Sequence, residues 1–487
     1  MSTIEVLLIA LVLLIIVYTL VLRRSPKNLP PGPRSLPIVG NLFEFTGSRQ
    51  VYKDFLKYRE KYGDVIRFSF GPSRDFFVVF GRKAIHKGLI EQGNDFKFRP
   101  SNLYLINKLF HGKGVLFGNG ESHQKLRKFT LDSLITFGLG KKKLEERIKD
   151  EARILADELE SYGGKPRDIR KTLKGAVANI IAGIVYGSRF DYGDPDFLLL
   201  IRSIEAIFTT IAGHLPENFL PFLAYLPNSK TRQVLNAAGD MTIFARRKIK
   251  EHRETFDPKN IRDFVDLYLK AEQQEDEIVT EENMFRDIID LSIAGTESTA
   301  TALAWAVLYL IINPDVQDKC QKEILENVGS VRAVSLSDKE QLQYLDATIK
   351  ETLRLASIVP LGVPHTVLKD TQFDGYTIPK DSTIIFHVNS VLADPEVWKK
   401  PDEFHPERFL TEEGKKNKRD FFLPFLLGLR SCPGKPLVTT ELFLFLGNLL
   451  QRFTFKIPPG CQTPSVERVH KGLTCQPHPY QVCVVPN

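Results

Sequence analysis

The sequence predicts a mainly helical fold with small β-sheets, of α+β class, in one large domain behind an N-terminal membrane anchor. Three observations support this. The chain has 487 residues, 43% of them hydrophobic, enough for a large core. The pattern from about residue 121 to about 355 is mostly helical, and short β-type runs lie on either side of it. No linker and no internal repeat divides residues 41–487, so we expect them to fold as one unit.

The N-terminus has the features of a retained anchor, residues 1–24. Residues 6–22 carry no charge and, at about 1.5 Å per residue, can just cross a hydrocarbon core. The alternative, a cleaved signal peptide, would have its basic residues before the apolar run. Here Glu5 precedes the run and Arg23 and Arg24 follow it, which predicts that the body of the protein lies on the cytoplasmic side.

Residues 25–40 form the next segment, and its run LPPGPRSLPIVG predicts a stiff hinge. After it, residues 65–70 and 75–80 are β-type runs joined at Gly71-Pro72, a hairpin pattern. The longest helix is expected over Asn283–Ile312, where Asn313-Pro314 ends it, and its apolar second half predicts burial. A last long helix is expected over Leu437–Arg452. Further strands are expected at 375–379, 382–388, 453–457 and 481–485.

Composition and charge exclude several classes of protein. The net charge of +7 suits an anionic membrane or an acidic protein partner, and no basic stripe with stacking aromatics indicates nucleic acid. The five cysteines include no CxxC pair, so a zinc ribbon or a redox dithiol is not expected. Their small number indicates a reducing compartment, although a Cys475–Cys483 disulfide stays open.

One cysteine lies in an unusual loop, FLLGLRSCPG, between an aromatic run and a helix. Cys432 comes just before the helix that begins near Gly434, and a helix N-terminus favours thiolate over thiol. A nucleophilic cysteine would need a histidine base, which no motif here supplies. A single thiolate ligand with Arg430 nearby suits haem, because the arginine can pair with a propionate.

Phe425, Gly428, Arg430, Cys432 and Gly434 spell F-x-x-G-x-R-x-C-x-G without a mismatch. This resembles the haem-binding signature of the cytochrome P450 family, and the rest of the chain resembles its animal microsomal drug- and lipid-oxidising branch. The resemblance implies haem b with Cys432 as iron ligand, O2, and NADPH-derived electrons delivered by a reductase.

A second motif, AGTEST, lies midway along the longest expected helix. An acid and hydroxyls in a buried apolar helix are costly unless they serve a function, although back-bonded hydroxyls and a solvent-reaching glutamate are the plain alternative. The resemblance implies that Glu297, Ser298 and Thr299 form the catalytic set and supply protons. The family usually has threonine where this chain has Ser298. Serine is freer about χ1, so looser coupling of electrons to product is expected.

A third motif, KETLRL, places Glu351 and Arg354 on one helix face. Alone this is a common surface ion pair. The resemblance adds Arg408 from a later P-E-R-F segment and implies a structural network.

The resemblance also implies the contacts of the haem. Propionate partners would be Arg99, Arg127, His365 and Arg430. His123 replaces a usual tryptophan, keeping an N–H donor but losing ring area. The full set of cofactor-binding candidates is Arg99, His123, Arg127, Ala294, His365, Phe425, Arg430 and Gly434, and the substrate-binding candidates are Leu105, Ile106, Phe208, Ala294, Val359, Gly362, Val363 and Leu473.

The predicted function is that of a haem-thiolate monooxygenase in the endoplasmic reticulum membrane, acting on an apolar steroid, fatty acid or xenobiotic. The sequence has no flavin, dinucleotide or iron–sulfur motif, so electrons must come from another protein. The resemblance implies that this donor is an NADPH-dependent flavoprotein reductase, with cytochrome b5 as a second candidate donor. Three lysines near the motifs could dock the reductase: Lys125, Lys128 and Lys435. The alternative is that they form an ordinary solvated basic face. Alternatives are a peroxide-rearranging haem-thiolate isomerase or dehydratase, a non-enzymatic haem or lipid carrier, and a haem-free cysteine nucleophile.

Overall fold

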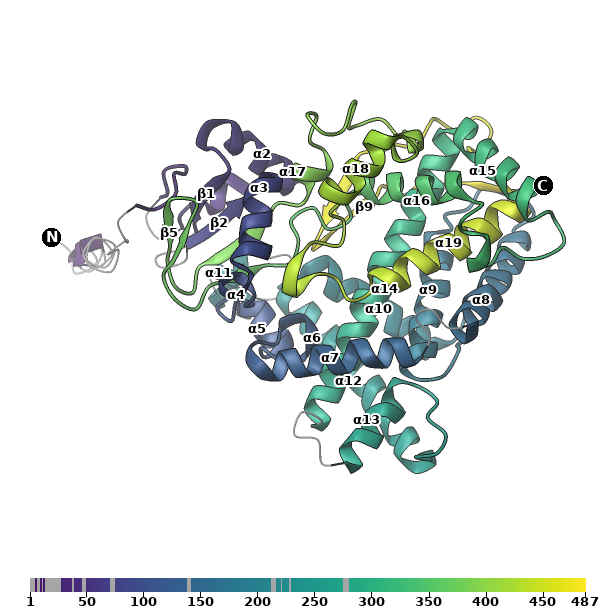
Figure 1. Ribbon diagram of the computed structural model, residues 1–487. Coiled ribbons are helices and arrows are strands. Elements are labelled where there is room, and N and C mark those ends of the chain that lie inside the picture. Colours follow the sequence, from purple (N-terminus) through teal and green to yellow (C-terminus); the bar gives the residue numbers. More distant parts are fainter. Residues whose placement is uncertain are drawn as a thin grey trace.

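The computed structural model describes residues 5–6, 9–10, 12–13, 28–36, 39–45, 50–70, 75–137, 142–211, 216–219, 221–226, 229–274 and 280–487. Most of the expected anchor, residues 1–24, lies outside the described residues, as does the expected Gly71-Pro72 turn. Long helices make up most of the body and the β-sheets are small, so the predicted fold class is confirmed (Figure 1).

The α-helices follow the chain in this order: α2 (Val51–Tyr62), α3 (Gly81–His86), α4 (Gly93–Phe96), α5 (Tyr104–Phe110), α6 (Gly114–Phe117), α7 (Gly120–Thr136), α8 (Lys142–Glu160), α9 (Arg170–Val185), α10 (Pro195–Thr210), α11 (Pro216–Phe219), α12 (Lys230–Thr255), α13 (Phe264–Gln273), α14 (Glu281–Ile312), α15 (Pro314–Asn327), α16 (Gln343–Ala356), α17 (Asn389–Leu392), α18 (Glu412–Phe421) and α19 (Lys435–Arg452). Short 3-10 or π turns are η1 (Leu42–Phe45), η2 (Lys87–Glu91), η3 (Pro221–Tyr225), η4 (Leu336–Asp338), η5 (Pro406–Phe409) and η6 (Gly428–Arg430).

Helix α14 is the central element of the fold. Its first turn is capped by the Thr280 hydroxyl, which accepts from the Asn283 amide, so the helix begins two residues before the expected start. It ends where predicted, at Ile312 before Asn313-Pro314. Among the described residues it is the one helix long and apolar enough to cross a membrane, but 83% of its most apolar stretch is buried. Helix α14 is therefore a core helix.

The largest sheet has four strands in the order β1-β2-β6-β3. The predicted hairpin is present: β1 and β2 pair antiparallel with Val65 opposite Val79. Strand β2 pairs parallel with β6, and β3 pairs antiparallel with β6. The strands are β1 (Val65–Ser69), β2 (Asp75–Val79), β3 (His365–Thr366), β4 (Thr371–Phe373), β5 (Tyr376–Ile378), β6 (Thr383–Phe386), β7 (Phe453–Lys456), β8 (Arg468–Lys471), β9 (Thr474–Pro477) and β10 (Cys483–Pro486), and the two-stranded sheets are β7–β10, β4–β5 and β8–β9.

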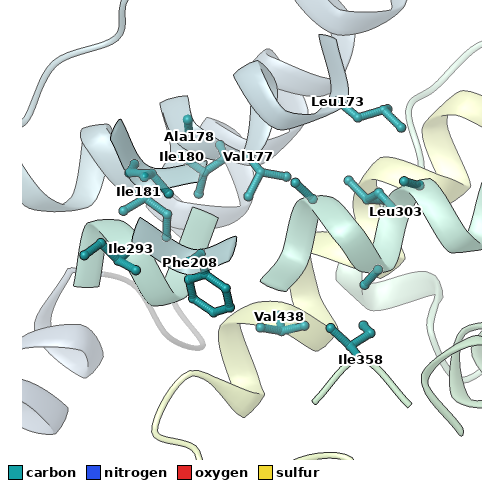
Figure 2. Close-up of a cluster of buried hydrophobic side chains, with 14 of the residues drawn as sticks. Leu173, Val177, Ala178, Ile180, Ile181, Phe208, Ile293, Leu303, Ile358 and Val438 are labelled. Carbon is teal, nitrogen blue, oxygen red and sulfur yellow. The ribbon is translucent and has the colours of Figure 1, made fainter. Parts of the chain in front are cut away.

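The core forms where α9, α14 and α19 meet. Figure 2 shows Val177 and Ile181 of α9 together with Ile293 of α14 and Val438 of α19. Gly295 allows α9 to approach α14 closely, because a Cβ at this position would lie 2.5 Å from the Ile181 side chain. All five cysteines are free, so the Cys475–Cys483 disulfide does not form. The contact of α14 with α19 brings the AGTEST motif to the cysteine loop.

Candidate functional site

The loop around Cys432 is held in place by its backbone. The Cys432 amide donates to the Phe425 carbonyl at 3.0 Å, and α19 begins three residues after the cysteine. Gly428 has φ +74°, and a Cβ there would lie 2.1 Å from the Leu89 carbonyl, so only glycine lets the loop pack against η2. These contacts explain why the motif needs a glycine at 428.

Cys432 is exposed. The protein atoms packed around the sulfur desolvate it, and this raises the pKa of the Cys432 thiol. The backbone N–H groups of Gly434 and Lys435 and the Arg127 guanidinium lower the same pKa. A cation at the sulfur would tip this balance to thiolate. The sulfur is thus placed as a metal ligand.

The sulfur shares an apolar cavity with the AGTEST motif. Ser298 and Thr299 of α14 line this cavity together with Cys432, as do Ala294 and Gly295 one turn earlier. The remaining lining residues come from α7, α9, α14, the cysteine loop and α19: Leu134, Ile181, Ile184, Val185, Leu291, Pro433, Gly434, Leu437 and Val438. Two motifs far apart in sequence are therefore joined in one water-poor space.

The three residues of the expected catalytic set differ in what their side chains contact. The Ser298 hydroxyl donates to the Ala294 carbonyl at 2.6 Å and lines the cavity. The Glu297 carboxylate instead pairs with Lys174 Nζ at 2.9 Å and accepts from Gln476 Nε2 at 2.7 Å. Burial raises the pKa of Glu297, and Lys174 and Gln476 partly oppose this effect. Thr299 is fully buried.

Sequence analysis missed both partners of Glu297. Gln476 lies in β9, on the hairpin whose turn reaches α10. Lys174 is in α9, where it is the one charged residue in an otherwise apolar stretch, LKGAVANIIAGIV. That isolated lysine could have indicated an ion pair with a buried acid, because a cation in an apolar helix face usually has a partner.

Buried cations gather beside the cavity. Arg430 donates to the Lys97 carbonyl at 2.6 Å and contacts His123 Nε2 at 2.5 Å, while Arg127 donates to the Ser431 carbonyl at 2.5 Å. Burial lowers the pKa of Arg99 well below its usual value, and Arg430 and Arg127 lower it further. Among the described residues, no carboxylate pairs with Arg99, Arg127 or Arg430. Such a cluster fits an anionic ligand.

His365 adds a donor to this cluster. Its Nδ1 lies 2.6 Å from the Phe96 carbonyl, and its buried Nε2 has no hydrogen-bond partner in the described part of the chain. Burial and the nearby Arg99 lower the pKa of His365, so the ring is neutral. A thiol facing an apolar cavity, with cations and an unpaired imidazole at its edge, fits haem b: Cys432 would hold the iron, and Arg99, Arg127, His365 and Arg430 would hold the propionates.

The third motif forms a buried network. Arg354 Nε and Nη2 donate to the Glu351 carboxylate at 2.8 and 2.9 Å, and Arg408 Nε donates to the same carboxylate at 2.9 Å. Arg354 also donates to the carbonyls of Leu392 and Pro401. The network joins α16 to η5 and to the loop that follows α17.

The structure brings some substrate candidates together. Ala294 lines the cavity with Cys432. The Phe208 carbonyl on α10 accepts from the Leu473 amide at 3.4 Å. The Val363 carbonyl accepts from Arg99 at 3.0 Å, which places it at the cation cluster. The other seven substrate candidates are not among the described residues that line the Cys432 cavity: Leu105, Ile106, Phe208, Val359, Gly362, Val363 and Leu473.

Comparison with known proteins agrees with this site. Residues 30–484 match the family described as "Cytochrome P450". The chain is 38% identical to "Cytochrome P450 2B4" of Oryctolagus cuniculus over 473 residues, which is 95% of this chain and 96% of that protein. It is 36% identical to "Cytochrome P450 2J3" of Rattus norvegicus over 491 residues, 99% of this chain and 96% of that protein. The chain therefore belongs to the cytochrome P450 family, the haem b monooxygenases that use O2 and NADPH-derived electrons.

Proposed function

We propose that this protein is a membrane-anchored monooxygenase that inserts one oxygen atom of O2 into an apolar small molecule of the steroid, fatty acid or xenobiotic class. The observation that carries the proposal is the shared cavity of Cys432, Ser298 and Thr299. Its lining is mostly aliphatic, which suits an apolar substrate. Residues 1–24 would be the anchor, 25–40 the hinge and 41–487 the catalytic domain.

Each residue of the site has a distinct task in this proposal. Haem b, when bound, supplies the activation of O2. Cys432 holds the iron through sulfur, and Arg99, Arg127, His365 and Arg430 neutralise the propionates. The Ser298 hydroxyl lies in the cavity and orients water there, and Glu297, in the same helical turn, provides protons. The aliphatic walls exclude bulk water and orient the substrate by shape.

The membrane location and the electron donors that we propose for this protein are inferred from its expected anchor and from exposed lysines. An apolar substrate concentrates in a membrane, and we propose the endoplasmic reticulum membrane with the catalytic domain on its cytoplasmic face. Electrons would come from an NADPH-dependent flavoprotein reductase, with cytochrome b5 as a second donor. Lys125 is about half exposed and Lys435 is exposed beside the cysteine loop, so both are accessible to an acidic partner.

The first test is the carbon monoxide difference spectrum of the dithionite-reduced protein. A strongly red-shifted Soret band is expected for the wild type and lost in Cys432→Ser, while Cys461→Ser, at an exposed cysteine outside the site, keeps it. An unshifted band in the wild type would refute thiolate ligation.

The second test is turnover with reductase and ¹⁸O₂. One labelled oxygen atom is expected in the product. Product formed from a hydroperoxide without reductase, and no labelled product with it, would refute the monooxygenase proposal in favour of the isomerase or dehydratase alternative.

A further inference from the structure

Glu441 is a buried carboxyl to which the proposed function gives no task. It lies on α19, the helix that follows Cys432, and its side chain is 0% exposed. Within the described part of the chain no charged group acts on it, and burial raises the pKa of Glu441 well above its usual value. Glu441 is therefore a neutral carboxylic acid in the folded protein, with one O–H group to donate.

The Thr299 hydroxyl, on α14, is the one polar group that acts on this acid. Its contact with the carboxyl opposes the effect of burial on the pKa of Glu441. The contact falls short of a complete hydrogen bond, because both oxygens of Glu441 and the Thr299 Oγ1 lack a hydrogen-bond partner among the described residues. Unpaired polar atoms are costly in an apolar interior, so we expect the Glu441 O–H to donate to Thr299 Oγ1.

The acid lies directly behind the wall of the Cys432 cavity. Leu437 and Val438 line the cavity, and Glu441 follows them by one helical turn on the same face of α19. Thr299 is among the described residues that line the cavity, whereas Glu441 is not. A Thr299 hydroxyl that faces Glu441 is therefore turned toward α19, and Thr299 presents its methyl group to the cavity.

Ser298 differs from Thr299 in this respect. Its hydroxyl donates to the Ala294 carbonyl, and the residue lines the cavity without a contact to α19 that would turn the hydroxyl away. A buried water needs several polar partners, so two neighbouring hydroxyls in the cavity would hold water more firmly than one. The direction of the Thr299 hydroxyl thus sets how dry the cavity is beside Cys432.

We propose that Glu441 is a positioning residue, which holds the Thr299 hydroxyl on the α19 side of α14 so that Ser298 alone offers a hydroxyl to the Cys432 cavity. Glu441 does not reach the cavity and acts on it through Thr299. The inference deepens the proposed function, because it names the residue that keeps this wall of the substrate cavity apolar. It does not depend on which residue supplies protons.

The first test measures the hydrogen bond itself in the ferric holoprotein. Infrared difference spectra show the C=O stretch of the neutral carboxyl, and Glu441→Gln identifies the band. Thr299→Val removes the hydroxyl and keeps the shape of the side chain, so the band should move to higher frequency as the hydrogen bond is lost. Thr299→Ser keeps a hydroxyl and should hold the band at its wild-type frequency.

Thr301→Val is the matched control, since Thr301 is buried on the same helix and is not among the described residues that line the cavity. It should leave the Glu441 band unchanged, and a normal carbon monoxide difference spectrum shows that each variant has folded with haem. A band that Thr299→Val does not move, or that Thr301→Val moves equally far, would overturn the proposal. So would the absence of a Glu441 band, because an ionised carboxylate cannot donate.

The second test measures the polarity of the cavity with carbon monoxide as the probe. In the reduced carbon monoxide complex, the C–O stretch moves to lower frequency when a hydroxyl or water donates toward the bound molecule. Glu441→Leu frees the Thr299 hydroxyl and should cause this shift. The double variant Glu441→Leu/Thr299→Val has no such hydroxyl, so its C–O stretch should return to the wild-type frequency. A shift that persists in the double variant would refute the positioning role, because Glu441 would then act on helix packing and not through Thr299.

The carbon monoxide difference spectrum separates this inference from the proposed function. A Glu441 band that Thr299→Val leaves in place, together with a strongly red-shifted Soret band, refutes the positioning and keeps Cys432 as the iron ligand. A Glu441 band that moves, together with a Soret band that lacks this shift, supports the positioning and refutes thiolate ligation.

Discussion

Arg354 binds Glu351 at two points inside the core: the Nε–Oε2 distance is 2.8 Å, the Nη2–Oε1 distance is 2.9 Å, and neither side chain is exposed. Arg408 donates to the same carboxylate. One carboxylate thus faces two guanidinium groups. The arrangement holds α16 against η5, and both precede the cysteine loop in the chain.

Glu351→Gln should strongly destabilise the protein. The neutral amide leaves two buried cations without a counter-charge, which costs about 3–5 kcal/mol when one partner of a buried pair is removed. Urea unfolding of the holoprotein, followed by the Soret band, measures the loss. Lys57→Met removes one partner of an exposed pair, Lys57–Asp54, and should change stability by about 0.5 kcal/mol or less. Equal effects of the two substitutions would contradict a structural role for the network.

Ser298→Ala and Ser298→Thr should change coupling in opposite directions. The alanine variant loses the cavity hydroxyl and should release more peroxide per NADPH, whereas threonine restricts χ1 and should release less than the wild type. Ser292→Ala is the control, because its hydroxyl makes the same bond four residues back, to the Ile288 carbonyl, on the same helix. If Ser292→Ala uncouples the enzyme as strongly as Ser298→Ala, the effect comes from the helix and not from the cavity.

The sequence predicted those parts of the fold that local signals determine. Periodicity and Pro314 located α14 to within two residues, and the fixed spacing of the cysteine motif found Cys432. The pairing of Glu297 with Lys174 depends instead on how α9 packs on α14, which no local pattern encodes. For the same reason the contact of Arg430 with His123 became visible only once α7 and the cysteine loop were placed together.

Gly472→Ala should disturb the side of the protein where α10 meets the β8–β9 hairpin. Gly472 has φ +64°, and a Cβ there would lie 2.0 Å from the Phe208 carbonyl, so the hairpin must move away from α10. We expect weaker binding of apolar ligands, seen as a raised Kd in Soret titrations. Gly460→Ala carries a similar φ of +77° with nothing within 4 Å, so it isolates the backbone strain from the clash. Identical Kd values for Gly472→Ala and Gly460→Ala would remove the hairpin contact from any role in ligand binding.

Asp287 should make stability depend on pH. Its buried carboxyl accepts from the Tyr268 hydroxyl at 2.7 Å and from the Val115 amide at 3.0 Å, and burial raises its pKa to about 7. In the unfolded chain this carboxyl loses its proton near its usual pKa of 3.8. The folded state therefore binds the proton more tightly, and this contribution to stability is present at low pH and lost as the pH rises through about 7.

The comparison with Asp287→Asn isolates that contribution, because an amide of nearly the same shape does not titrate. The wild type should lose stability relative to the variant, on the order of a few kcal/mol, between about pH 5 and about pH 7. Urea midpoints of both holoproteins across this range measure the difference. Asp290 lies close by, with a pKa that burial and Asp287 also raise, but it is present in both proteins. A difference that stays constant over this range would mean that Asp287 is already ionised in the fold, and that the hydrogen bonds from Tyr268 and Val115 outweigh its burial.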